Sequence, residues 1–379
     1  MLRKTVIETP HGPVHTPCFM PIATKGAVKT LSTEDVRALG PQIILSNTYH
    51  LFLRPGLEAI KELGGLHKLM GWEKAILTDS GGYQVFSLEG QVTEEGVTFK
   101  SHIDGSKQFL SPEISIDMQL AIGSDILMQF DDVAAGTSTR ERYEDAMERS
   151  LRWAQRSKDA FLSLRAKRSN PALEIASSSS TPRKDMLLFA IVQGGTHEDL
   201  RERSASELIK MGFDGYAIGG LSVGEAREDA FRITKKLCAQ LPEDKPRYFM
   251  GGGFPEEIVY YVSVGVDLFD CVLPTRNARH GTLFLWRDDP SICVPKALAA
   301  ARFGASDVEI ARELYTQVHI TNESYALDQT PVDPHGLFEY SKAYLRHLFS
   351  VQELLAQRLA TLQNLRFYLR LMEELRKSV

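Results

Sequence analysis

The chain has 379 residues, of which 43% are hydrophobic and 25% are charged, and its formal net charge is -5 at pH 7. This composition is ordinary for a soluble globular protein, and the length allows one large domain or two smaller ones. The negative charge excludes a globally basic nucleic-acid-binding protein, so any nucleic acid must be bound by a local patch.

The cysteines and the apolar runs bear on the compartment. The chain contains Cys18, Cys238, Cys271 and Cys293 but no Cys-x-x-Cys pair, which argues against a disulfide framework. The first residues, "MLRKTVIETPHGPVHTP", lack the apolar core of a signal peptide. No apolar run approaches the roughly 18 residues needed to span a bilayer. We therefore expect a cytoplasmic protein that does not bind a membrane.

Short apolar runs that end in small or polar residues recur along the chain. Continuous apolar runs are typical of strands that are buried on both faces, as in a parallel sheet. They lie at 18–24, 43–49, 75–82, 125–132, 188–195, 215–220, 248–253 and 267–272. Helical patterns such as "STEDVRAL" and "PEEIVYYVSVG" separate several of them. Eight strands with intervening helices predict a (β/α)8 TIM-type barrel, and a doubly wound sheet is the alternative.

Three segments depart from this repeat. Residues 85–110 alternate in polarity and carry turn signals, which predicts a β-hairpin decoration. Residues 162–185 are Ser-rich and basic, and they predict an exposed insertion that is solvated rather than bound to RNA. Residues 287–317 predict a second insertion with one or two short helices.

The C-terminal sequence predicts helices. Its Leu and aromatic residues recur at helical spacing, and Arg and Lys occupy the other face, so the apolar stripe should pack on the barrel. We therefore expect a catalytic barrel domain at 1–286, the second insertion at 287–317 and a C-terminal subdomain at 318–379.

The chemistry of a barrel gathers at the carboxyl ends of its strands. Three predicted strand ends carry acids, and others carry an amide, glycines or a thioether. These residues are Asp79 in "TDSGGYQ", Asp131 and Asp132 in "MQFDDV", Gln193 in "IVQGG", Gly219 and Gly220 in "AIGGLSVGE", Met250 in "YFMGGG" and Asp270 in "LFDCV". The glycine runs match neither a P-loop nor a dinucleotide fingerprint.

Two carboxylates that work together indicate displacement at a sugar carbon. One attacks the anomeric carbon while the other moves a proton, through a covalent intermediate. Asp, Gln and backbone N–H groups can also bind a purine edge, and Tyr83 and Met250 could cover its two faces. Each residue taken singly has a structural explanation, such as a helix cap, an ion pair or a core position. Only the joint pattern indicates a site.

The stretch "VDLFDCVLPTRNARHG" places Asp270 close to Arg276, Arg279 and His280. A salt bridge that closes a turn is one explanation. The other is a nucleophilic carboxylate beside a bound anionic substrate.

The motifs "TDSGGYQVFSL", "IVQGG", "GYAIGGLSVGE" and "GVDLFDCVLPTRNARHG" resemble those of the queuine tRNA-ribosyltransferases, or tRNA-guanine transglycosylases. "NTYHLFLRPG" and "YSKAYLRHL" match as well, so the resemblance covers nearly the whole chain outside the two insertions. It implies a TIM-type barrel with a C-terminal subdomain. It also implies exchange of guanine at the wobble position of a tRNA with a GUN anticodon. The incoming base would be a 7-deazaguanine, either queuine or its aminomethyl precursor.

The resemblance implies a role for each candidate residue. Asp270 is the expected nucleophile on ribose C1′, and Asp79 is the expected general acid and base. Arg276 and Arg279 are expected to bind the RNA backbone, which would make binding sensitive to salt. The residues expected to bind the base are Asp131, Gln193, Gly219 and Gly220 at its edge, with Tyr83 and Met250 on its faces. The sequence leaves open whether the chain forms a homodimer.

One departure concerns the structural zinc site of the family, a Cys-x-Cys-x-x-Cys cluster with a distant His. The chain has "VDPHGLFE" at 332–339 in place of the cluster, and Gln363 in place of the His. His335 and His347 supply too few ligands for a tetrahedral zinc ion, and a cryptic site that uses Cys293 is the alternative. We expect no metal and no cofactor, with the second insertion offsetting the lost stabilisation.

A second departure concerns the base. "MQFDDVAAGTSTR" resembles the eukaryotic catalytic subunit at Asp132 and Val133, where most bacterial members have Glu-Cys, whereas Val223 resembles the bacterial pattern. Our hypothesis is that the chain accepts queuine itself.

Three other functions compete with this interpretation. A non-catalytic tRNA-binding partner subunit would not need Asp270. A retaining glycoside hydrolase would need several exposed aromatic residues along a sugar cleft, and the predicted strand ends offer few. A base-exchange enzyme that acts in the tRNA D-loop would have a further RNA-binding domain after the barrel.

Overall fold

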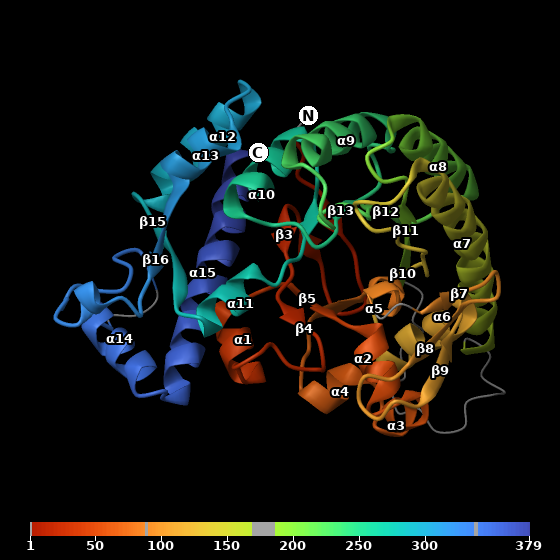
Figure 1. Cartoon of the computed structure of the whole chain (residues 1–379), viewed down its shortest axis with the longest axis horizontal. Helices are drawn as coiled ribbons and strands as arrows, with labels where there is room; N and C mark the ends of the chain where they lie inside the picture. The colour runs from red at the N-terminus through yellow and green to blue at the C-terminus, as the bar shows by residue number, and fades with distance from the viewer. Residues whose placement is uncertain (1, 88–89, 169–185, 337–339) are drawn as a thin grey trace.

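The centre of the molecule is one parallel sheet that curls into a barrel, in a computed structural model that describes residues 2–87, 90–168, 186–336 and 340–379 (Figure 1). The strand order is β3-β14-β13-β12-β11-β10-β6-β5-β4, and every pair in it is parallel. The strands are β3 (Cys18–Phe19), β4 (Ile22–Ala23), β5 (Ile43–Ser46), β6 (Ala75–Thr78), β10 (Ile126–Met128), β11 (Leu187–Val192), β12 (Gly215–Ile218), β13 (Arg247–Phe249) and β14 (Leu268–Phe269).

The sheet closes because its first and last strands belong to one extended segment. β3 and β4 are separated by Met20 and Pro21, and proline has no N–H to donate to a ladder. On one side the Met20 N–H donates to the Phe269 carbonyl at 2.8 Å, and on the other the Leu45 N–H donates to the Pro21 carbonyl at 3.0 Å. The eight predicted strands and the predicted barrel are therefore confirmed.

Helices cover the outer face of the barrel. Six of them follow strands and one is C-terminal: α1 (Thr33–Leu39), α6 (Pro112–Ile122), α7 (Arg140–Arg168), α8 (Glu198–Met211), α9 (Arg227–Gln240), α10 (Pro255–Val264) and α15 (Leu354–Ser378). Short helices connect β5 to β6: α2 (Thr48–Leu53), α3 (Leu57–Glu62) and α4 (Leu66–Met70). Local signals set the ends: Ser32 and Asp35 form a capping box at α1, and Gly265, with a φ of 102°, caps the carboxyl end of α10.

The core has two layers because successive side chains of a strand point to opposite faces. Along β6, Ile76 belongs to the layer between the sheet and the helices, whereas Ala75 and Leu77 belong to the layer inside the barrel. The inner layer consists largely of strand residues, so the barrel interior is filled and the chemistry is left to the strand ends.

The predicted decoration is a three-stranded antiparallel sheet of β7 (Gln91–Val92), β8 (Val97–Lys100) and β9 (Lys107–Leu110). The prediction was wrong for residues 85–87, which belong to α5 (Gly82–Ser87). It was also wrong for residues 162–168, because α7 continues to Arg168 rather than ending in a loop. Phe161 and Leu164 lie one helical turn apart on the core side, which supports that last stretch. Residues 169–185 lie outside the described residues.

The second insertion contains α12 (Pro290–Arg302) and α13 (Asp307–Leu314), which confirms the expected short helices. Its last residues enter β16 (Tyr315–His319), which pairs antiparallel with β15 (Thr282–Trp286). Because this pair joins residues on both sides of the insertion, the domain boundaries at 286 and 317 stay a proposal. The remaining elements are β1 (Val6–Ile7), β2 (Val14–His15), α11 (Leu273–Arg279), η2 (Glu323–Tyr325) and α14 (Lys342–Ser350).

The C-terminal helix α15 packs on the barrel, as its apolar stripe predicts. It contacts α1, α10 and β3 and so occupies the position of the eighth barrel helix. The Tyr368 ring lies 4.9 Å from the Phe19 ring, and its hydroxyl donates to the Gly253 carbonyl at 2.8 Å. Arg376 donates to the Pro17 carbonyl at 2.7 Å.

All four cysteines are buried and unpaired. Among the described residues, none of the helices combines the length and apolar character that crossing a membrane requires.

Candidate functional site

Asp79 follows β6 directly and is held by the residues that open α2. Its Oδ1 accepts the Thr48 backbone N–H at 2.9 Å, and its Oδ2 accepts an N–H of the Asn47 side chain. The Thr48 hydroxyl also donates to the Asp79 backbone carbonyl, at 2.5 Å. The "NT" of the motif "NTYHLFLRPG" therefore orients this carboxyl group, a role that the sequence did not reveal.

The surroundings of Asp79 bring the pKa of its carboxyl group close to neutral pH. Burial raises the pKa of Asp79 to about 7, the Thr48 N–H lowers it, and the nearby Asp270 and Asp131 carboxylates raise it. Near neutral pH the group is thus present in both its acid and its base form, as a general acid and base must be.

Asp270 follows β14 and is bound by two donors on the same oxygen. The Tyr248 hydroxyl donates to Oδ1 at 2.6 Å and the Gly251 N–H donates to Oδ1 at 2.8 Å. Within the described residues, Oδ2 receives no hydrogen bond from another residue, and no arginine pairs with the carboxylate. The turn-closing salt bridge is therefore wrong as an explanation of this stretch. An oxygen free of donors is the more nucleophilic one.

Tyr248 is hydrogen-bonded to Asp270 and lies within the electrostatic reach of Asp79. Burial raises its pKa well above the usual value, and the negative charges of Asp270 and Asp79 raise it further, so the phenol stays a donor. This residue was not predicted from the sequence. The available signal was its position two residues before Met250 on one predicted strand, which places both side chains on the same face.

Asp131, Gln193 and the Gly219–Gly220 pair meet beside these acids. Ser80 donates to Asp131 Oδ1 at 2.9 Å and Gln193 Nε2 donates to Oδ2 at 2.7 Å. Burial raises the pKa of Asp131 to about 6, and the two donors lower it. A Cβ at Gly220 would lie 2.2 Å from Gln193 Oε1, so only glycine fits there, with a φ of 61°.

Met250 and Tyr83 differ in how closely they join this group. A Cβ at Gly219 would lie 3.4 Å from Met250 Sδ, which places the half-buried thioether against the glycine pair. Tyr83, on α5, is 52% exposed, and its ring contact is Phe86 at 6.4 Å. Gly82, its neighbour, packs directly on Asp131. The structure thus places Tyr83 at the rim of the group, with its ring half-exposed among the described residues.

The arginines after Asp270 lie on α11. Arg276 is exposed, and Arg279 is half-buried and donates to the Thr275 carbonyl at 2.9 Å. Burial and the neighbouring Arg276 lower the pKa of Arg279. Neither forms an ion pair with a carboxylate in the described part of the chain, so this helix presents uncompensated positive charge close to Asp270.

Asp132 is occupied by structural partners. Arg142 donates to both of its carboxylate oxygens, at 2.6 and 3.0 Å, and Arg149 donates to Oδ2 at 2.6 Å. The Asp132 N–H donates to the Ser150 hydroxyl at 2.9 Å. These partners on α7 hold the loop that carries Asp131.

The residues present do not fit the zinc site that the family resemblance implies. Gln363 Nε2 donates to Asp333 Oδ2 at 2.8 Å, and the His335 backbone N–H donates to Oδ1 at 2.9 Å. Asp333 is 2% exposed, and burial raises its pKa. A carboxylate and an amide bonded to each other supply neither a thiolate nor a free imidazole. Among the described residues, no three metal ligands gather at this place.

Replacement of Gln363 by Ala should lower the free energy of unfolding by about 1–3 kcal/mol, because it leaves Oδ2 of the buried Asp333 carboxylate without its side-chain donor, while the His335 N–H still binds Oδ1. Gln317, exposed on β16, provides the matched control for a Gln→Ala change. Thermal melting measures both variants. Addition of excess EDTA should leave the melting temperature of the unchanged chain where it was, whereas one tightly bound zinc per chain would contradict the expectation.

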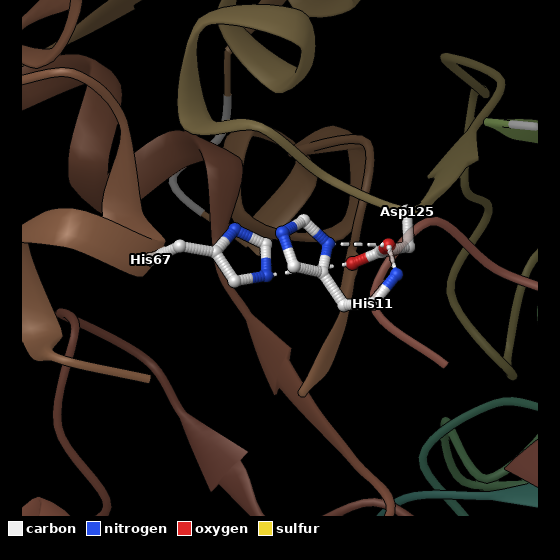
Figure 2. A group of neighbouring side chains, drawn as sticks. All are labelled: His11, His67 and Asp125. Carbon is white, nitrogen blue, oxygen red and sulfur yellow. Dashed lines mark hydrogen bonds and ion pairs between the residues drawn. The ribbon is translucent and has the colours of Figure 1, made fainter. Parts of the chain in front are cut away.

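The described residues do contain one group of potential metal ligands elsewhere, His11, His67 and Asp125 (Figure 2). Asp125 precedes β10, so the group lies at the end of the barrel opposite to Asp79. His11 Nδ1 lies 2.8 Å from Asp125 Oδ1, His67 Nε2 lies 3.5 Å from Oδ2, and the two rings stack at 3.7 Å.

The hydrogen bonds of this group show which of its imidazole nitrogens carry protons. His67 Nε2 lies 3.0 Å from the Lys74 carbonyl, which only accepts, so this nitrogen carries a proton. Burial favours protonation of Asp125, but bonds from His11 and His67 outweigh it and lower its pKa. The ionised carboxylate then requires a proton on His11 Nδ1. Both nitrogens that face Asp125 are donors. The group therefore attaches the N-terminal segment, through His11, to the residue that precedes β10.

Comparison with known proteins gives one consistent result. The family model described as queuine tRNA-ribosyltransferase matches residues 2–379. The chain is 45% identical to the queuine tRNA-ribosyltransferase of Koribacter versatilis, over 98% of this chain and 89% of that protein. It is 46% identical to that of Pelotomaculum thermopropionicum, over 100% and 90%. For the Zymomonas mobilis protein the values are 45%, 100% and 88%.

Proposed function

The chain belongs to the queuine tRNA-ribosyltransferase family, and from this premise we propose that it exchanges guanine at the wobble position of tRNAs with a GUN anticodon for a 7-deazaguanine base. The observation that carries the proposal is the pairing of Asp270, with one oxygen free of donors, and Asp79, whose pKa is about 7. A non-catalytic partner subunit would need neither property.

The first half of the reaction forms the covalent intermediate. Asp270 Oδ2 attacks C1′ of the target ribose while Tyr248 and Gly251 hold Oδ1. The C1′–N9 bond breaks and its electron pair leaves with guanine, which takes the proton of neutral Asp79. The products of this half are an Asp270–ribose ester, free guanine and an ionised Asp79.

The second half reverses these roles. Ionised Asp79 accepts the proton from N9–H of the incoming base, and N9 attacks C1′. The ester bond breaks and its electron pair returns to Asp270. Two displacements at one carbon retain its configuration.

The base edge has partners of the right kind in the neighbouring group. Asp131 accepts from the N1–H and the 2-amino group of guanine, while the second Nε2 proton of Gln193 and the Gly220 N–H donate to O6. Gly219 allows the close approach, and Met250 and Tyr83 cover the two faces of the ring. A glycoside hydrolase would not need this purine-shaped set of donors and acceptors.

Exchange of radiolabelled guanine into tRNA tests the proposal. We expect incorporation into a tRNA with a GUN anticodon and none into the same tRNA with adenosine in place of the target guanosine. Mapping of the incorporated label should locate it at the wobble position alone. Absence of exchange while the tRNA still binds would favour the partner-subunit function instead.

We also propose that Arg276 and Arg279 bind phosphates next to the target nucleotide, because both lie on α11 without a carboxylate partner among the described residues. Replacement of Arg276 by Gln should raise the KM for tRNA several-fold at about 0.15 M salt. It should also lower the slope of log Kd against log salt by the amount expected for the loss of about one phosphate contact. Arg302, exposed on α12, is the matched control. An unchanged salt slope would contradict this role.

The preferred base is a separate part of the proposal. Asp132 is held by Arg142 and Arg149, and Val133 is buried next to it, so the Asp132 carboxylate is engaged by the protein and not available to bind the base. We propose that queuine itself is accepted. Competition between queuine and the aminomethyl precursor for one tRNA measures this preference, and incorporation of the precursor alone would rule it out.

Location and assembly complete the proposal. The cytoplasm is the expected location, because the proposed substrate is tRNA, and cell fractionation checks it. The sequence leaves open whether the chain forms a homodimer, and light scattering on the active protein decides between a monomer and a dimer.

A further inference from the structure

Arg201 is a buried arginine directly behind the base-edge group. It lies near the start of α8, and its side chain is 1% exposed. Its guanidinium donates to four backbone carbonyls. They are Gly195 at 2.8 Å from Nε, Val192 and Gly219 at 2.7 Å each from Nη1, and Gly220 at 3.2 Å from Nη2. It forms no ion pair within the described residues. Its hydrogen bonds hold the end of β11 and the loops that follow β11 and β12.

These bonds fix the direction of a peptide group. In a trans peptide the carbonyl and the N–H point in opposite directions. The Gly219 carbonyl points toward Arg201, so the Gly220 N–H points away from α8. Arg201 lies behind the base-edge group, so this direction leads toward that group, and Gly220 itself borders Gln193, because a Cβ built on it would meet Gln193 Oε1 at 2.2 Å. The Gly220 N–H has no acceptor among the described residues and is free to donate to a ligand.

The glycine pair needs such a restraint. Glycine adopts left- and right-handed backbone conformations with similar ease, so a peptide between two glycines can rotate at low cost. Rotation would replace the N–H in the pocket by a carbonyl. A donor at this position matches a purine with an oxygen at C6, whereas an acceptor matches a purine with a 6-amino group.

We propose that Arg201 is a positioning residue that gives the pocket its preference for 6-oxo purines by holding the Gly219–Gly220 peptide with its N–H toward the base. This inference rests on the proposed function. The four carbonyl partners need the planar fork of a guanidinium, because the single nitrogen of lysine cannot reach four acceptors in different directions. Burial lowers the pKa of Arg201 to about 9, which leaves it charged at neutral pH.

Replacement of Arg201 by Lys tests the inference. We expect the KM for guanine to rise about tenfold, the cost of one ligand hydrogen bond, and the KM for tRNA to rise by at most the same factor, because its target guanine uses the same pocket. The preference for guanine over 2-aminopurine, which lacks the 6-oxygen, should fall by about the same factor. Arg203→Lys is the matched control, because Arg203 lies on the same helix but is exposed and paired with Glu144 and Glu148.

Two outcomes separate this inference from the proposed function. Failure of the unchanged enzyme to exchange guanine would overturn the proposed function itself. Normal exchange together with an Arg201→Lys variant that keeps its guanine preference would overturn the role of Arg201 alone. If this variant does not fold, a crystal structure of the unchanged chain with guanine decides. The Gly220 N–H within hydrogen-bond distance of O6 supports the inference, and a carbonyl in that place overturns it.

Discussion

Replacement of Asp270 by Asn is expected to reduce base exchange by at least about 10³-fold, because an amide cannot attack C1′ as a carboxylate does. Asn is close to Asp in shape, and its Oδ1 can still accept from Tyr248 and Gly251. The fold and the binding of tRNA should therefore survive. Label exchange measures the rate, and a melting curve measures the fold.

The covalent intermediate offers a second readout of the same change. Denaturing electrophoresis of the wild-type enzyme with tRNA, before a new base is added, should show a protein–RNA adduct. The Asp270→Asn variant should show none. Asp244→Asn, at an exposed position before β13, is the control and should form the adduct normally. An adduct in the Asp270→Asn variant would mean that another residue is the nucleophile.

The two half-reactions should respond to pH in opposite directions. In the proposed reaction, Asp79 must be neutral to protonate the departing guanine and ionised to accept a proton from the incoming base. Its pKa is about 7, raised from the ordinary value by burial and by Asp270 and Asp131. Above pH about 7 the acid form becomes scarcer, so adduct formation should slow by up to tenfold per pH unit. Below pH about 7 the base form becomes scarcer, so resolution of the adduct should slow instead.

Single-turnover experiments separate the two halves. Adduct formation is followed by quenching tRNA and enzyme at different times, and resolution is followed after addition of base to a preformed adduct. Protonation of Asp270 and Asp131 adds its own decline at lower pH, so the comparison belongs between about pH 6.5 and pH 8.5. The Asp79→Asn variant should lose most of the activity. It should also lose both the slowing of adduct formation above pH about 7 and the slowing of adduct resolution below it. Parallel pH profiles for the two halves in the wild type would exclude Asp79 as the shared acid and base.

Much of this architecture was predictable because its causes are local. Each barrel strand is a short apolar run, and a strand buried on both faces needs no alternation. The acids of the site were visible because a charged residue at the end of such a run is conspicuous. Asp79 and Asp270 could be found in this way, and Gln193 and Asp131 with them.

The supporting residues were not predictable, because their significance comes from tertiary position. Arg201 and Arg203 are two arginines of one amphipathic helix, "DLRERSASEL", and only the packing of α8 buries the first and exposes the second. Tyr248 has the appearance of a core aromatic residue until its hydroxyl is seen on Asp270. The start of the first insertion was placed too early, at residue 162, because a basic, Ser-rich composition outweighed the helical spacing of Phe161 and Leu164.

The packing of α15 on β3 has a consequence for biosynthesis. The first barrel strand and the helix that covers it are separated by more than 300 positions of the chain. While the ribosome makes the intervening segments, one flank of β3, including Phe19, has no permanent cover. The ring of helices can close only when nearly the whole polypeptide has emerged. The nascent barrel therefore stays incomplete until α15 has been synthesised.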